Sequence, residues 1–160
     1  MSYVTLKIGE KAPEFSGLNQ DKKEISLKDF LGKYVVVYFY PKDDTPGCTI
    51  EALDFTKLNN EFAQANAVIL GVSKDDCDSH KKFVEGKQLT INLIADTNKK
   101  INQSYGVWQK KQFMGKEHMG SMRTTFLIAK DGEILRIWEN VNPEGHAKEV
   151  LEEIKKLNQD

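Results

Sequence analysis

The sequence has 160 residues, of which 39% are apolar and 29% are charged, a composition close to that of ordinary globular proteins. We therefore expect one domain spanning residues 1–160, because a chain of this length buries enough surface to fold without disulfides or metals. The formal net charge is −1, so no overall positive field would attract nucleic acid or an anionic membrane.

Cysteine usage and hydropathy predict a cytoplasmic protein. The longest apolar run, Tyr34–Tyr40, is much shorter than the ~20 residues that cross a bilayer, and the N-terminus lacks the apolar region of a signal peptide. Two cysteines, Cys48 and Cys77, do not make a disulfide scaffold. In a reducing cytoplasm each would be free, reactive or part of a transient pair.

The predicted elements begin with a hairpin, in which Phe15–Leu18 and Glu24–Leu27 flank a polar loop. The next segment, Lys33–Tyr40, is rich in β-branched and aromatic residues without alternation, which predicts a strand covered on both faces at the centre of a sheet. From Cys48 onward apolar residues recur at helical spacing, so Cys48 is expected to open a helix.

The middle of the chain predicts a βαβ unit. Ala67–Val72 is a second buried strand and Asp75–Lys87 a second helix, which together give parallel strands and a right-handed crossover. Leu89–Ala95 predicts a further strand, after which Asp96 or Thr97 would cap a short helix.

The last third of the chain predicts a loop, a hairpin and a helix. The apolar residues between Trp108 and Met119 are expected to form a loop that covers the core. Thr124–Ala129 and Glu133–Trp138 flank an Asp-Gly turn and form an antiparallel hairpin. A closing amphipathic helix is expected to be capped by Asn142 and to start at Pro143. The whole pattern predicts an α/β, thioredoxin-like fold: a central mixed sheet with flanking helices and an N-terminal β-hairpin.

Cys48 lies where a strand ends and a helix begins, the place at which open α/β sheets gather their chemistry. Unpaired backbone N–H groups and the helix dipole stabilise a thiolate there, and only the thiolate is a nucleophile. Pro41 and Pro46 stiffen the preceding loop, and Thr45 offers a hydroxyl about one turn from the sulfur. From position alone, a buried and inert cysteine remains an alternative.

The resemblance to a known family rests on these residues. Pro41, Thr45 and Cys48 fit the Pro-x-x-x-Thr-x-x-Cys motif of peroxiredoxins, and nearly the whole chain resembles the bacterioferritin comigratory protein, or peroxiredoxin Q, branch. This resemblance implies one thioredoxin-like peroxiredoxin domain that reduces hydrogen peroxide and alkyl hydroperoxides through a sulfenic acid at Cys48. It also implies that thioredoxin or a small thiol recycles the oxidised enzyme, that no cofactor is needed, and that the chain is a monomer.

A cation is needed beside the sulfur, because the departing oxygen carries negative charge. The sequence has two arginines. Arg123 matches the family's active-site arginine, and its guanidinium could contact sulfur and peroxide together, whereas we interpret Arg136 as structural. A surface ion pair is the alternative for Arg123. The histidines, His80, His118 and His146, are scattered without metal-site spacing and are interpreted as surface residues, so no metal is expected.

The role of Cys77 stays open between two alternatives. Relatives with their own resolving cysteine carry it at positions that match Leu53 or about Val84, and neither is cysteine here. Cys77 follows the next parallel strand after that of Cys48, so both thiols are expected at one edge of the sheet. Cys77 is therefore either a resolving cysteine or a bystander in a one-cysteine enzyme.

Two other functions were weighed against peroxide reduction. A disulfide oxidoreductase normally needs Cys-x-x-Cys, and Thr45 stands in place of the first cysteine. A binding module without chemistry would leave Thr45, Cys48 and Arg123 as a coincidence.

Overall fold

The computed structural model describes residues 2–159. A seven-stranded sheet has the order β2-β1-β5-β4-β3-β8-β9, and β6 and β7 form a separate two-stranded ribbon. The strands are β1 Ser16–Leu18, β2 Glu24–Ser26, β3 Tyr34–Phe39, β4 Ala67–Ser73, β5 Asn92–Ala95, β6 Trp108–Phe113, β7 Lys116–Ser121, β8 Thr124–Ile128 and β9 Ile134–Trp138. The helices are α1 Pro46–Gln64, α2 Cys77–Lys87, α3 Lys100–Ser104 and α4 His146–Asn158, with a 3-10 turn over Leu27–Phe30.

The sheet is mixed, as predicted. Strands β3, β4 and β5 run parallel, whereas β1 and β8 run antiparallel to β5 and β3 and extend the sheet on either side. The N-terminal hairpin of β1 and β2 is antiparallel and lies at one edge. These pairings, with the helices on both faces, confirm the predicted thioredoxin-like architecture.

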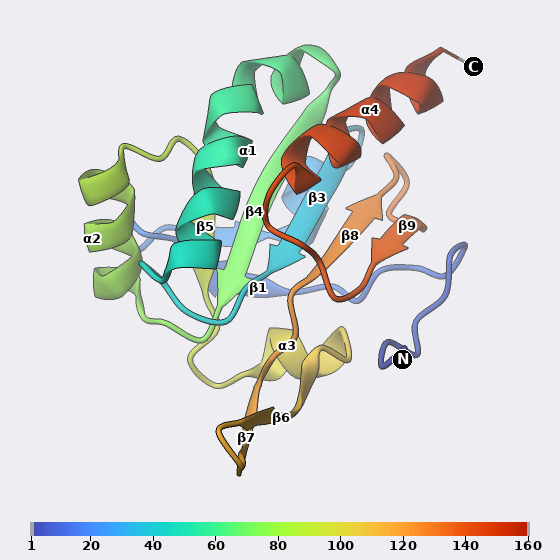
Figure 1. Ribbon diagram of the computed structural model, residues 1–160. Coiled ribbons are helices and arrows are strands. Elements are labelled where there is room, and N and C mark those ends of the chain that lie inside the picture. Colours follow the sequence, from blue (N-terminus) through green and yellow to red (C-terminus); the bar gives the residue numbers. More distant parts are fainter. Residues whose placement is uncertain (1, 160) are drawn as a thin grey trace.

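Strand β3 divides the apolar core into two layers. All six of its residues are buried, and successive side chains of a strand point to opposite faces. Val36 and Tyr38 belong to the cluster under α1, α2 and α4, whereas Val35 and Val37 belong to the cluster on the α3 side. Figure 1 shows α1 and α4 side by side over one face of the sheet, with α2 next to α1. The non-alternating sequence of β3 is therefore explained by helices or loops covering both of its faces.

The βαβ units place both cysteines at one edge of the sheet. Strand β3 leads into α1, and β4, paired with it in parallel from Tyr34↔Ala67 to Phe39↔Val72, leads into α2. Parallel strands end at the same edge, so the first turns of α1 and α2 both begin there. Cys48 lies in the first turn of α1, and Cys77 is the first residue of α2.

The prediction of an apolar loop between Trp108 and Met119 is wrong. This stretch belongs to the antiparallel β6–β7 ribbon, which extends away from the main sheet (Figure 1). Met114 and Gly115 both have positive φ at its turn, the backbone that two-residue hairpins favour. Met114 is 87% exposed and Met119 45% exposed, so neither covers the core.

The start of the last helix also differs from the prediction. The side chain of Asn142 accepts a hydrogen bond from the Glu144 amide at 3.2 Å, but α4 begins only at His146. Gly145 has φ +78° at the position before the helix, and this left-handed backbone separates the Asn142 turn from α4.

Candidate active site

Cys48 is held in the first turn of α1 by the local sequence. Thr45 is the N-cap residue with extended backbone, and Pro46 is the first helical residue, where its missing N–H removes no helical hydrogen bond. Cys48 is the third helical residue and is only 1% exposed. Its sulfur therefore experiences the positive end of the helix dipole.

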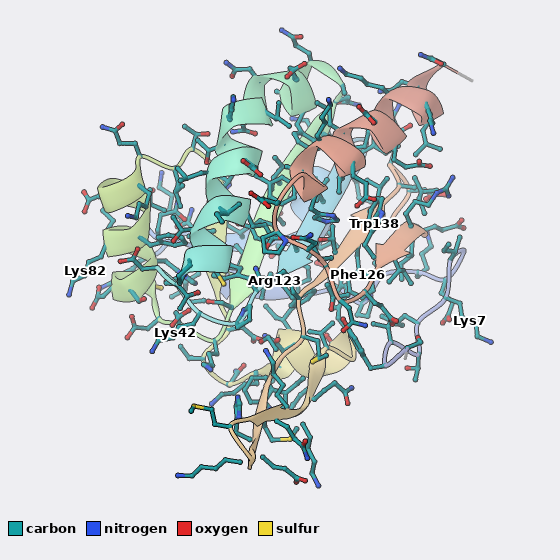
Figure 2. All side chains as sticks on the ribbon, viewed as in Figure 1. Lys7, Lys42, Lys82, Arg123, Phe126 and Trp138 are labelled. Carbon is teal, nitrogen blue, oxygen red and sulfur yellow. The ribbon has the colours of Figure 1, made fainter. Side chains whose placement is uncertain are left out.

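Arg123 is the residue immediately before β8, and its side chain reaches the Cys48 sulfur. Its Nη2 donates a hydrogen bond to Cys48 Sγ at 3.4 Å, so the guanidinium makes the contact with the sulfur that the sequence analysis expected. Gly47 makes the approach possible, because a Cβ there would lie 3.1 Å from Arg123 Nη2 and 3.3 Å from Pro143 Cγ. Figure 2 shows Arg123 near the first turn of α1. The guanidinium thus places a positive charge and a hydrogen-bond donor beside the sulfur.

A second partner of Arg123, Glu51, was missed from the sequence. Its Oε1 accepts a hydrogen bond from Arg123 Nη1 at 2.8 Å, and its side chain is fully buried. The other oxygen, Oε2, has no hydrogen-bond partner among residues 2–159. The sequence does hold a signal for Glu51, because this carboxylate lies one turn after Cys48 and next to Ala52 on the buried stripe of the helix.

The three groups are electrostatically coupled. Burial raises the pKa of Glu51 to about 7, although the nearby Arg123 pulls it back down. Burial also opposes the charge on Arg123, but Glu51 and Cys48 outweigh it and raise the pKa of the guanidinium above its usual range. Arg123 therefore stays positively charged and interacts with both Glu51 and Cys48.

The burial of Glu51 predicts a pH-dependent stability. Because its pKa is higher in the folded chain than the ordinary 4.5, the free energy of unfolding falls as pH rises from about 4.5 to about 7, by about 3 kcal/mol in total. We expect Glu51→Gln to remove this fall. Denaturant unfolding of both proteins at pH 5 and pH 8 measures it.

The matched control is the exposed Glu152, whose replacement by Gln should leave the pH dependence as in the unmodified protein. An equal loss of stability between the two pH values in the Glu51→Gln protein and the unmodified protein would contradict the assignment.

The other two motif residues shape the loop before α1. Pro41 is half-buried at its start. The Thr45 hydroxyl donates a hydrogen bond to the Lys42 carbonyl at 2.8 Å, so in this structure it closes the loop, whereas the expected interaction was with the sulfur or substrate. Thr45 still lies at the helix N-cap, three residues before Cys48.

Cys77 is a half-buried free thiol at the start of α2. It lines a hollow together with Gly17 and Leu18 of β1, Ala95 of β5 and Ile101 of α3. Burial raises the pKa of the Cys77 thiol, and Asp76 and Asp78 raise it further while Lys22 lowers it. Cys77 is therefore a weaker nucleophile at neutral pH than an ordinary exposed cysteine.

The interpretation of the histidines as surface residues is wrong for two of three. His80 is fully buried against Asp43, and His146 is 3% exposed between Thr125 and Glu149. His118 is exposed, as predicted.

The described part of the chain contains no group of three or more His, Cys, Asp and Glu side chains that could hold a metal ion. Within residues 2–159, no helix has both the length and the apolarity to span a membrane.

Comparison with known proteins agrees with this geometry. The model of the AhpC/TSA family matches residues 8–137. This chain belongs to that family. The peroxiredoxin falls in the Bcp, or peroxiredoxin Q, branch that its motif predicted. It is 48% identical over 149 residues to a peroxiredoxin bcp of Helicobacter pylori, and the match covers 93% of this chain and 98% of the relative. It is 42% identical to peroxiredoxin Bcp of Bacillus subtilis over 98% of this chain and 99% of the relative.

Solved structures of the same branch share the whole fold of this peroxiredoxin. The bacterioferritin comigratory protein of Xanthomonas campestris, studied for its alkyl peroxide reduction activity, is 34% identical with a TM-score of 0.87, over 96% of this chain and 98% of that chain. A PrxQ mutant of Xylella fastidiosa is 32% identical with a TM-score of 0.91, over the same shares of the two chains.

Proposed function

We propose that this peroxiredoxin reduces hydrogen peroxide and alkyl hydroperoxides with Cys48 as its nucleophile. The chain is a thiol-dependent peroxidase of the Bcp branch. The observation that carries the assignment of Cys48 is the 3.4 Å contact between Arg123 Nη2 and its sulfur, in the first turn of α1. A helix N-terminus and a guanidinium both hold negative charge on the sulfur.

The proposed reaction begins with attack of the Cys48 thiolate on one peroxide oxygen. A sulfur–oxygen bond forms, the oxygen–oxygen bond breaks, and the sulfur keeps the transferred OH as a sulfenic acid. The departing oxygen takes the electron pair of the broken bond, accepts a proton from solvent water and leaves as water or an alcohol. Arg123 stabilises the charge on that oxygen, Thr45 offers a hydroxyl to the bound peroxide, and Pro41 stiffens the loop that leads to Thr45 and Cys48.

Two assays on the purified chain test this function against its alternatives. We expect catalytic loss of peroxide when a thiol reductant is present. Reduction of insulin disulfides without peroxide turnover would instead identify a disulfide oxidoreductase. Neither activity, in a folded protein, would leave a binding module without chemistry.

We propose further that Cys77 resolves the sulfenic acid. Its thiolate would attack the Cys48 sulfur, form a sulfur–sulfur bond and displace hydroxide, which accepts a proton from solvent and leaves as water. Thioredoxin or a small thiol would then reduce the resulting disulfide. The placement of both thiols at one sheet edge supports this step. Because Cys48 is buried and a disulfide needs Cα atoms within roughly 7 Å, the first turn of α1 must unwind before the bond forms.

The resolving role predicts how the Cys77→Ser protein oxidises. With excess peroxide and no external thiol, we expect the unmodified chain to stop at a disulfide that lacks the mass of two hydrogens. Cys77→Ser should instead proceed to a sulfinic acid at Cys48, because nothing traps the sulfenic acid. Mass spectrometry of the two intact proteins measures the difference. Oxidised unmodified chain in which Cys77 is still alkylated by iodoacetamide would show a one-cysteine enzyme.

The remaining parts of the proposal concern partners and location. We propose that the chain acts as a monomer in the cytoplasm, with no nucleic-acid or membrane partner. The nearly balanced charge supports this, since a net charge of −1 gives no long-range attraction to either surface.

A further inference from the structure

A buried polar network ties the loop before Cys48 to the start of α2. Asp43 is its centre: Oδ1 accepts from the Tyr40 hydroxyl at 2.6 Å, and Oδ2 accepts from the Ser79 hydroxyl at 2.8 Å. The same Oδ2 lies 2.7 Å from His80 Nδ1. The Asp43 amide donates to Asp75 Oδ2 at 2.8 Å. These contacts join the end of β3, the loop and the first turn of α2.

His80 is held by hydrogen bonds at both ring nitrogens. Its Nε2 lies 3.1 Å from the Ile94 carbonyl oxygen, which can only accept, so Nε2 donates this bond. Its Nδ1 lies 2.7 Å from Asp43 Oδ2. The ring is fully buried. Hydrogen bonds between buried groups are stronger than those exposed to water, so these contacts fix the ring and the carboxylate relative to each other.

Asp43 anchors a loop that would otherwise be exposed. It is 7% exposed, whereas its neighbours Lys42 and Asp44 are exposed. Asp44 has φ +60°, a left-handed backbone that costs a non-glycine residue free energy and persists only when its surroundings hold it. The loop runs directly into Thr45, the N-cap of the helix that carries Cys48. Displacement of Asp43 would therefore move the first turn of α1 relative to Arg123.

We propose that His80 is a positioning residue for the Cys48 site, which acts by clamping Asp43 and thereby the loop Pro41–Thr45. His80 contacts neither the sulfur nor the bound peroxide; it sets the place of the thiol beside Arg123. The role of Cys48 as the nucleophile belongs to the proposed function, on which this inference rests. A small displacement of a reacting group slows a reaction sharply.

The test compares variants of the two clamped residues by their rate constants with hydrogen peroxide, measured by stopped flow. His80→Phe fills the ring's space but removes both N–H groups, and Asp43→Ala removes the acceptor. We expect each to slow the reaction about tenfold, and the double variant to be no slower than the slower single variant, because the two residues act as one unit. Asp43→Asn should retain nearly the full rate, since its amide can donate to a neutral His80.

A second readout separates positioning from chemistry. A loosened loop should expose Cys48, so iodoacetamide should alkylate the Cys48 peptide faster in His80→Phe and Asp43→Ala than in the unmodified chain or Asp43→Asn. His146→Phe is the matched control: it removes another buried histidine, whose partners Thr125 and Glu149 lie outside the loop. We expect it to lose stability while keeping its peroxide rate.

Several results would overturn the inference. These are unchanged peroxide and alkylation rates in both His80→Phe and Asp43→Ala, multiplicative losses in the double variant, or an Asp43→Asn protein as slow as Asp43→Ala. If His80→Phe does not fold, the comparison of Asp43→Ala with Asp43→Asn decides. An unmodified chain that does not react with peroxide would contradict the proposed function, and the alkylation rates would still test the clamp.

Discussion

The Cys48→Ser protein is expected to keep its fold and to consume no peroxide above the uncatalysed background. A serine hydroxyl is not appreciably ionised near neutral pH and is a poor nucleophile towards an oxygen–oxygen bond. Serine fits the buried space of Cys48 in the first turn of α1, so the change should remove the reaction and leave the helix. Peroxide consumption with a thiol reductant, together with circular dichroism, measures both effects.

Cys77→Ser is the matched control for this loss, since it removes the other thiol of the chain. It should react with its first equivalent of peroxide at the rate of the unmodified chain. Turnover by Cys48→Ser near that of the unmodified chain would remove Cys48 from the reaction.

The second large effect is expected from Arg123→Ala, which should slow the reaction with peroxide by roughly tenfold or more. The variant loses the donor 3.4 Å from the sulfur and the positive charge that stabilises the departing oxygen. Stopped-flow measurement of the rate constant with hydrogen peroxide gives the effect.

Arg136→Ala is the control, because Arg136 also pairs with a carboxylate, Glu153 at 2.8 Å, but on the distant strand β9. Its rate should match that of the unmodified chain. If Arg123→Ala keeps the rate of the unmodified chain, Arg123 has no part in the reaction.

The parts of the fold that sequence reasoning predicted are those with a strong local pattern. The buried strand predicted over Lys33–Tyr40 spans Tyr34–Phe39. The helix expected to open at Cys48 begins two residues earlier, at Pro46. These two elements and the hairpin around Gly132 each follow from residue type and spacing. The β6–β7 ribbon was missed because its turn residue is Met114, which adopts positive φ without the Asn or Asp that usually indicates such a turn.

Site residues could be predicted where the motif and the chemistry both point to them. The reaction needs a cation, and of the two arginines in the chain Arg123 is the one that matches the arginine of the resembled family. Glu51 and His80 could not, because a glutamate on a helix and an isolated histidine are usually exposed. Their burial is set by the long-range partners Arg123 and Asp43, which lie 72 and 37 residues away in the chain.

Mass spectrometry of the reduced chain after one equivalent of hydrogen peroxide tests whether Cys48 is the residue that peroxide oxidises. We expect the peptide with Cys48 to gain one oxygen atom or to join the peptide with Cys77 through a disulfide, and the Cys48→Ser chain to do neither. An unmodified Cys48 peptide in a folded chain that has nevertheless consumed the peroxide would mean that another group reduces it.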